Sequence, residues 1–248
     1  MKMKVMLVGL LAVAGLALGQ KVKSKNEQDA LMAVFNATTP DAKIAAVDNL
    51  LAKYKDTEFK AGVLTMAAQA AQQKGDSPNA IVYGNRALEA DAKSFQAMLL
   101  VAGQIAQSTR EFDLDKDEKV KRVTQLSNDA IAAVNTAVKP NPQLTEDQWT
   151  SIKKDLIAQS HETLGVIASV DKKWDAAIAE YKAAVEGGAT PEASTMLRLA
   201  AAYTNARQFD QAMAMADQAL ALPNVPDNFK KIAQDEKQRA AKGKAGSK

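Results

Sequence analysis

Small residues recur at fixed intervals in three separate stretches of this 248-residue chain. In each stretch a first residue is followed by others at offsets of 12, 16 and 19 positions. The three series are Gly165, Ala177, Tyr181 and Ala184; Ala200, Ala212, Ala216 and Ala219; and Ala68, Ala80, Gly84 and Ala87, and Tyr181 is their one large member. Small side chains let two helices approach closely, so the shared spacing predicts a repeated helical hairpin. One hairpin cannot bury its apolar face alone, and neighbouring hairpins must therefore stack.

Hydrophobic periodicity predicts helices joined by short turns along nearly the whole chain, with no alternating strand pattern. The predicted helices span residues 27–37, 40–55, 58–74, 77–91, 93–108, 117–138, 146–170, 174–186, 191–206, 209–221 and 227–241. They form five antiparallel pairs and one terminal helix. In that terminal helix Phe229 and Ile232 are expected to supply the apolar face that caps the array.

Capping residues mark several helix starts independently of hydrophobicity. A hydroxyl side chain at the N-cap followed by proline at the first helical position is a favourable start. This chemistry is predicted at Thr39-Pro40, Ser77-Pro78 and Thr190-Pro191. Thr145 with Gln148 fits a capping box, in which the two side chains satisfy backbone donors reciprocally.

The stretch AAYTNARQFDQAMAMADQALALP, residues 201–223, carries a family resemblance. It has the small-residue spacing described above. Two of the series also have an aromatic residue nine positions after their first member, Trp174 and Phe209. This pattern resembles the tetratricopeptide repeat (TPR), a helix–turn–helix unit. The pair at residues 38–76 resembles N-terminal repeats of bacterial envelope proteins. This resemblance implies an all-α superhelical array of antiparallel helix pairs, a TPR-like α-solenoid, with a C-terminal capping helix.

The N-terminal segment predicts export. Lys2 and Lys4 precede an uncharged run from Val5 to Gly19, which is typical of a secretory signal peptide. These 15 uncharged residues are fewer than the roughly 20 that span a bilayer as a helix, so cleavage is favoured over an uncleaved anchor. The predicted organisation is a signal peptide at 1–19, a short linker at 20–26, a repeat domain at 27–226, a capping helix at 227–241 and a basic flexible tail at 242–248. The expected location is the periplasm or the outside of a bacterial cell.

Residues that could carry chemistry are few, and we predict no catalytic, cofactor-binding or metal-binding site. His161 is the only histidine and cysteine is absent, which excludes a cysteine–histidine pair or a zinc cage. His161 is expected to pack between helices. Asp113, Asp115 and Asp117 have the alternate spacing of a calcium loop, but Glu118 stands where such a loop needs glycine. A solvated acidic loop is therefore predicted.

The predicted function is a non-catalytic scaffold that binds a protein or an extended peptide, and it rests on the resemblance. In TPR arrays the first helix of each pair lines the concave face, which implies the partner-binding residues Gln69, Gln73, Gln96, Gln107, Gln159, Glu162, Thr204 and Asn205. Most are neutral and polar, so neutral or backbone-presenting segments are the expected ligands. The alternatives are a carboxylate-based hydrolase on a helical solenoid and a membrane-anchored envelope assembly factor. Nucleic-acid binding is disfavoured by the mildly acidic body.

Overall fold

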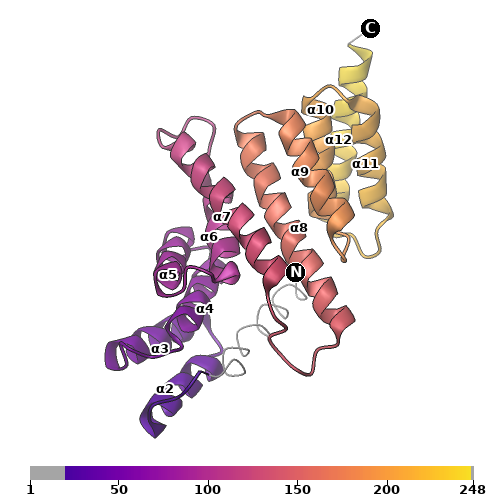
Figure 1. Cartoon of the computed structure of the whole chain (residues 1–248). Coiled ribbons are helices and arrows are strands. Elements are labelled where there is room, and N and C mark those ends of the chain that lie inside the picture. Colours follow the sequence, from indigo (N-terminus) through magenta and orange to yellow (C-terminus); the bar gives the residue numbers. More distant parts are fainter. Residues whose placement is uncertain (1–19, 247–248) are drawn as a thin grey trace. The chain divides into compact units, whose positions relative to one another are not determined.

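The computed structural model describes residues 20–246, and within these it contains eleven α-helices and no strand (Figure 1). The helices are α2 Lys25–Asn36, α3 Pro40–Lys53, α4 Lys60–Gln73, α5 Ser77–Ala90, α6 Phe95–Ser108, α7 Lys116–Thr136, α8 Glu146–Val170, α9 Trp174–Gly187, α10 Ala193–Asn205, α11 Phe209–Ala221 and α12 Asp227–Ala245. The predicted all-α fold class is confirmed. The predicted signal peptide lies outside the described residues.

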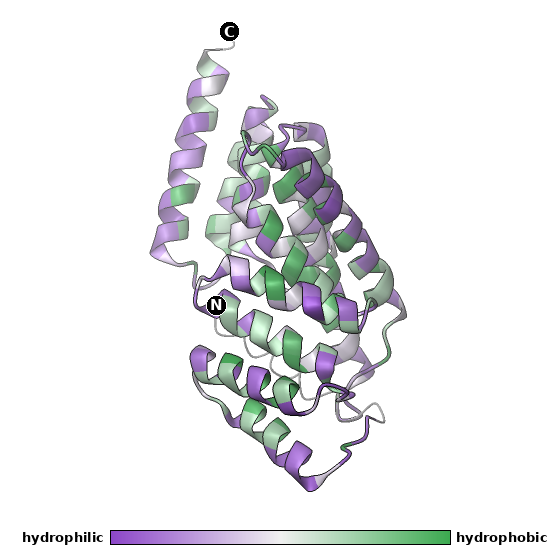
Figure 2. Cartoon of the chain, turned by 90° about the vertical axis from the view of Figure 1, so that its left-hand side faces the viewer, coloured by the Kyte–Doolittle hydropathy of each residue, from purple (hydrophilic) through white to green (hydrophobic). Residues whose placement is uncertain are grey.

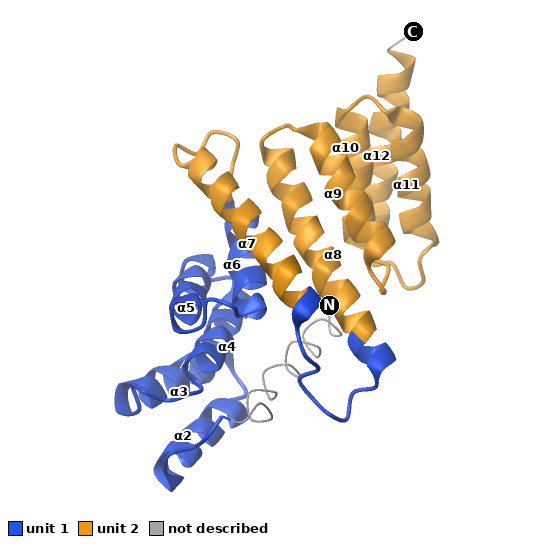
Figure 3. Cartoon of the chain, viewed as in Figure 1, with its two compact units in different colours: residues 1–108, 135–149 blue, residues 109–134, 150–248 orange. Residues whose placement is uncertain are grey.

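The chain divides into two compact units (Figure 3). Unit 1 takes in residues 1–108 and 135–149, and unit 2 takes in residues 109–134 and 150–248. One boundary lies at the end of α6, and the other two fall inside α7 and α8, so each of these two helices belongs partly to both units.

In unit 1 the helices from α2 to α6 pack consecutively, and α6 also contacts α4. Apolar residues, green in Figure 2, alternate with polar residues, purple, along the helices. The apolar residues that are buried form the core. Side chains exposed by at most 2% include Leu31, Val47, Leu50, Val63 and Leu64. Tyr83 of α5 adds a polar link, because its hydroxyl donates to Asp48 Oδ2 of α3 at 2.8 Å. Burial, followed by the nearby Asp48 carboxylate, raises the pKa of Tyr83 to about 12.

In unit 2, α9, α10, α11 and α12 also pack in order, as expected for a helical solenoid. Within each unit the predicted contact residues lie between packed helices, since every member of the three small-residue series is buried. At Gly165 of α8 an added Cβ would lie 2.6 Å from the ring of Tyr181 in α9. At Gly84 of α5 it would collide with Val101 of α6. The missing side chains at Gly165 and Gly84 therefore allow α8 to pack closely on α9 and α5 to pack closely on α6.

Two of the four predicted helix starts are confirmed. The Thr39 hydroxyl accepts from Ala42 N, and Thr145 and Gln148 form the reciprocal pair of a capping box. The predicted N-cap at Ser77 is wrong by one residue, because the carboxylate of Asp76 accepts from Asn79 N and is the cap, while the helix itself begins at Ser77 as predicted.

The predicted helix start at Thr190 is wrong, because Asp155 of α8 accepts hydrogen bonds from this segment. Asp155 Oδ1 accepts from the backbone nitrogens of Ala189 and Thr190 at 2.8 and 2.9 Å. The Thr190 hydroxyl also donates to Asp155 Oδ2 at 2.8 Å. The segment is thus held against α8, and α10 begins only at Ala193, with Glu192 in place of Thr190 at its N-cap.

The terminal helix packs through a different face from the one predicted. Phe229 is half-buried as expected, but Ile232 is 48% exposed, and the inward positions are Ala233 and Ala240. The helix also extends past the predicted end at residue 241 into the predicted flexible tail. An added Cβ on Gly243 would lie 2.5 Å from the Phe209 ring, so close packing on α11 keeps this last part helical.

Candidate interaction surfaces

Four of the predicted partner-binding residues lie in unit 1 on two helices that contact each other. Gln69 and Gln73 are four residues apart on α4, and Gln96 and Gln107 are eleven apart on α6, so each pair lies on one face of its helix. Gln73 and Gln107 are exposed, while Gln69 and Gln96 are half-buried. We call these four residues the amide row.

Two glycines that the sequence analysis did not single out share the faces of the amide row. Gly62 lies seven residues before Gln69, and Gly103 lies seven residues after Gln96. A Cβ added to either glycine would meet nothing within 4 Å. Glycine inside a helix costs about 1 kcal/mol relative to alanine. Since no packing contact requires these glycines, the space beside the amide row is open. Their helical spacing from the glutamines is the signal that could have identified them.

The other four predicted residues lie in unit 2 and do not form a comparable surface. Gln159 is exposed, and Glu162 Oε1 lies 3.4 Å from Arg198 Nε of α10. Thr204 is only 6% exposed and its hydroxyl donates to Ala200 O at 3.2 Å. Asn205 Oδ1 accepts from Arg239 of α12. Thr204 is therefore not on an accessible surface, and Asn205 is engaged by α12, because α12 packs against α10.

His161 takes part in a polar contact between α8 and α9. Its Nδ1 lies 2.7 Å from Glu180 Oε2, and the ring is half-buried. The adjacent Ser160 is fully buried and its hydroxyl donates to Leu156 O at 3.3 Å. The two side chains thus have separate partners, which gives them no arrangement of nucleophile and base.

In the acidic loop, residues 109–117, two carboxylates form ion pairs with Lys119 of the following helix. Lys119 Nζ lies 2.8 Å from Asp113 Oδ2 and 2.8 Å from Asp115 Oδ1. The hydrogen bond from Lys119, then that from Arg110 N, holds the pKa of Asp113 below its usual range. Over residues 20–246 no group of three His, Cys, Asp or Glu side chains is placed to hold a metal ion.

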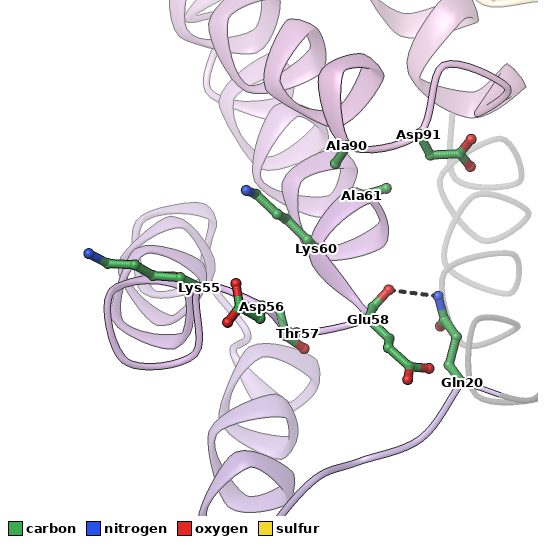
Figure 4. Close-up of a pocket in the computed structure, with 9 residues that line it drawn as sticks. All are labelled: Gln20, Lys55, Asp56, Thr57, Glu58, Lys60, Ala61, Ala90 and Asp91. Atoms are coloured by element: carbon green, nitrogen blue, oxygen red, sulfur yellow. Dashed lines mark hydrogen bonds between the residues drawn. The ribbon is translucent and has the colours of Figure 1, made fainter.

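A pocket of about 530 Å³ lies beside the turn between α3 and α4 in unit 1 (Figure 4). The segment before α2, predicted as a linker, is fastened to this turn. Gln20 Nε2 donates to Glu58 O, Lys21 N donates to Glu58 Oε2, and Lys23 Nζ donates to Asp56 O, at 2.9, 2.9 and 2.6 Å. The remaining lining includes Lys55, Lys60 and Asp91. This mixture of cations and carboxylates does not select one class of ligand.

Within the described residues, no helix has both the length and the apolar character needed to cross a membrane.

Comparison with solved structures shows the fold. A thermophilic TPR protein from Thermus thermophilus matches with a TM-score of 0.56 at 15% identity, over 85% of this chain and 98% of that chain. The MamA protein matches with a TM-score of 0.52 at 14% identity, over 87% of this chain and 94% of MamA. No protein-family model and no curated protein matches the sequence. The chain therefore has a TPR-like fold.

Proposed function

We propose that the protein is a non-catalytic scaffold that binds an extended segment of a partner protein along the amide row of unit 1. The supporting observation is the combination of glutamines with open space on the neighbouring helices α4 and α6. Each glutamine side chain offers both hydrogen-bond donors and an acceptor, as the backbone of an extended peptide does. Gly62 and Gly103 leave room for that backbone to approach the helices closely.

The chemistry of the amide row favours neutral ligands. A site for an acidic peptide end would use a cluster of Lys and Arg side chains, and the four residues of the row are all uncharged amides. Recognition through backbone groups makes the side-chain sequence of the partner less important than its extended conformation.

The proposal is tested with a triple variant in which Gln69, Gln73 and Gln107 are replaced by alanine. A displayed peptide library selected on the purified protein provides the probe, and calorimetry measures its affinity. The triple variant is expected to bind the selected peptide at least tenfold more weakly, a loss of about 1.4 kcal/mol. Its thermal midpoint is expected to fall by no more than a few degrees, because exposed or half-buried polar residues contribute little to stability.

A matched control replaces three exposed polar residues on the other helices of unit 1, namely Gln28, Asn49 and Glu89, by alanine. Unchanged peptide affinity is expected for this control. Binding that survives the first triple change but is lost in the control would place the working surface on α2, α3 and α5.

We propose further that the protein is exported and that processing leaves Gln20 as the first residue. The proposal rests on the paired lysines, the short apolar run and the small residues before Gln20. The intact mass of the protein recovered from the cell envelope is expected to correspond to residues 20–248. A mass that includes Met1 would instead support the membrane-anchored alternative.

A further inference from the structure

The acidic loop is fastened to the turn between α8 and α9 within unit 2. Lys116 Nζ lies 2.7 Å from Asp171 Oδ1, and Lys172 Nζ lies 2.5 Å from Glu111 Oε1. Inside the loop, Arg110 N donates to Asp113 Oδ2 at 3.1 Å. Lys116, followed by Lys173, lowers the pKa of Asp171, so this carboxylate stays charged under ordinary conditions. The loop is thus held in a defined conformation by polar contacts.

Two large apolar side chains stand out from this loop. Phe112 is 86% exposed and Leu114 is 107% exposed, and they are the most exposed large hydrophobic residues in the described part of the chain. The residues around them are acidic: Glu111, Asp113, Asp115 and Asp117. Large apolar side chains that a folded loop holds in water are typical of a contact surface whose partner is absent.

A pocket lies at the α8–α9 turn and beside the α10–α11 turn of the same unit. It has a volume of about 520 Å³ and is lined by Lys172, Lys173, Trp174, Asp175, Ala176 and Ala206. The Trp174 ring is half-buried, so part of it faces the pocket. Indole and alanine side chains provide apolar surface, and the two lysines of the lining outnumber its one carboxylate, that of Asp175.

The two turns beside this pocket have Lys172 and Arg207 in the left-handed backbone conformation, which favours glycine. Gly75, Lys172 and Arg207 each follow by seven residues the first member of a small-residue series, and all three have positive φ values of 75, 55 and 62°. Glycine adopts this conformation at no steric cost, whereas lysine and arginine are uncommon there. In unit 2 the two cations therefore add positive charge next to the pocket at a conformational cost.

We propose that the acidic loop of one molecule docks into this pocket of a second copy of the same chain. The loop brings two apolar side chains flanked by carboxylates, among which Asp117 is 97% exposed, and the pocket brings apolar surface beside Lys172 and Lys173. These lysines pair with Glu111 and Asp171 of their own chain but keep 58% and 67% of their side chains exposed, so each can also meet a carboxylate of a second copy. Lys172 contacts the loop and also lines the pocket, so the two features are adjacent within unit 2. A two-fold dimer requires such adjacent, self-complementary patches, because each copy then gives and receives the same contact.

Self-association is measured by sedimentation velocity on the protein as purified from cells, from about 1 µM to about 1 mM, a range that covers weak specific contacts. The wild-type protein is expected to show a concentration-dependent dimer that weakens with added salt. A loop variant, Phe112→Ser with Leu114→Ser, and a pocket variant, Ala176→Trp, are each expected to raise the dissociation constant at least tenfold. Ala176 is exposed, so the fold should accept the larger side chain.

Mixing the two variants provides the decisive comparison. The pocket variant keeps an intact loop and the loop variant keeps an intact pocket, so the mixture restores one of the two contacts. Fluorescently labelled variants are expected to associate more tightly with each other than either does with itself. A control, Val82→Ser with Val138→Ser, removes two exposed apolar residues of unit 1 and should dimerise as the wild type does.

Two results would overturn the proposal. One is a wild-type protein that stays monomeric over the whole range, which would assign the loop to a different partner. The other is a loop variant that dimerises as tightly as the wild type. Neither result bears on peptide binding by the amide row, which is measured with a different probe and different variants.

Discussion

Replacing Ala212 by tryptophan is expected to lower the free energy of unfolding by about 1–3 kcal/mol, or more if α11 cannot shift. Ala212 is 0% exposed, as are Ala80 and Ala177 at the same offset of their series. A tryptophan there must push α11 away from α10 or adopt a strained side-chain conformation. Urea denaturation measures the loss, and each kcal/mol should appear as a fall of about 2–4 °C in the thermal midpoint.

The control for this prediction lies two residues away on the same helix. Ala214 is exposed, so Ala214→Trp adds the same side chain where space is available. Its free energy of unfolding is expected to stay within about 0.5 kcal/mol of the wild type. Equal stability of the two variants would show that Ala212 does not occupy a helix contact.

Removing α12, by ending the chain at Pro226, is expected to destabilise unit 2 strongly. The helix covers Phe209 through Gly243, and its own Phe229 packs against the cluster around Ala216. Burial of a large apolar side chain contributes about 1.5–3 kcal/mol, so losing two partly buried rings should cost about 3 kcal/mol. The ion pairs from Lys237 to Asp217 and from Lys244 to Asp210 are largely exposed and add little.

The truncated protein should also bind a fluorescent apolar dye and aggregate at lower temperature, because a terminal repeat without its cap exposes apolar surface. A shorter truncation that removes only residues 246–248 is the control and should behave as the full chain. A chain ending at Pro226 that melts like the wild type would show that α12 does not cap the array.

The helices and their pairing could be predicted because both are encoded locally. An amphipathic period and a small residue at each crossing lie within one hairpin, and the offsets of 12, 16 and 19 relate residues of the same pair. The Thr145–Gln148 capping box is equally local. The predicted N-cap at Ser77 is displaced by one residue because Asp76, immediately before it, caps helices equally well.

The errors concern contacts between residues far apart in the sequence. Thr190 has a favourable capping sequence, but Asp155 binds it from 35 residues away. Thr204 and Asn205 occupy positions that an alignment assigns to the concave face, but the structure buries Thr204, and Arg239 of α12 binds Asn205. The acidic loop is solvated as predicted, with Glu111, Asp115 and Asp117 exposed, but its ties to the α8–α9 turn through Lys116 and Lys172 again join residues far apart in the sequence. No local pattern contains this information.

The contact between Gly165 and Tyr181 limits how the repeats can be exchanged. In the equivalent places the other series have Ala200 with Ala216 and Ala68 with Gly84. Tyrosine fits between α8 and α9 only because its partner has no side chain, since even a methyl group on Gly165 would lie 2.6 Å from the ring. A chimera that moves α9 alone into another hairpin would bring the tyrosine against an alanine. Both helices must be transplanted together, which makes the hairpin, not the single helix, the module that recombination or protein engineering can shuffle.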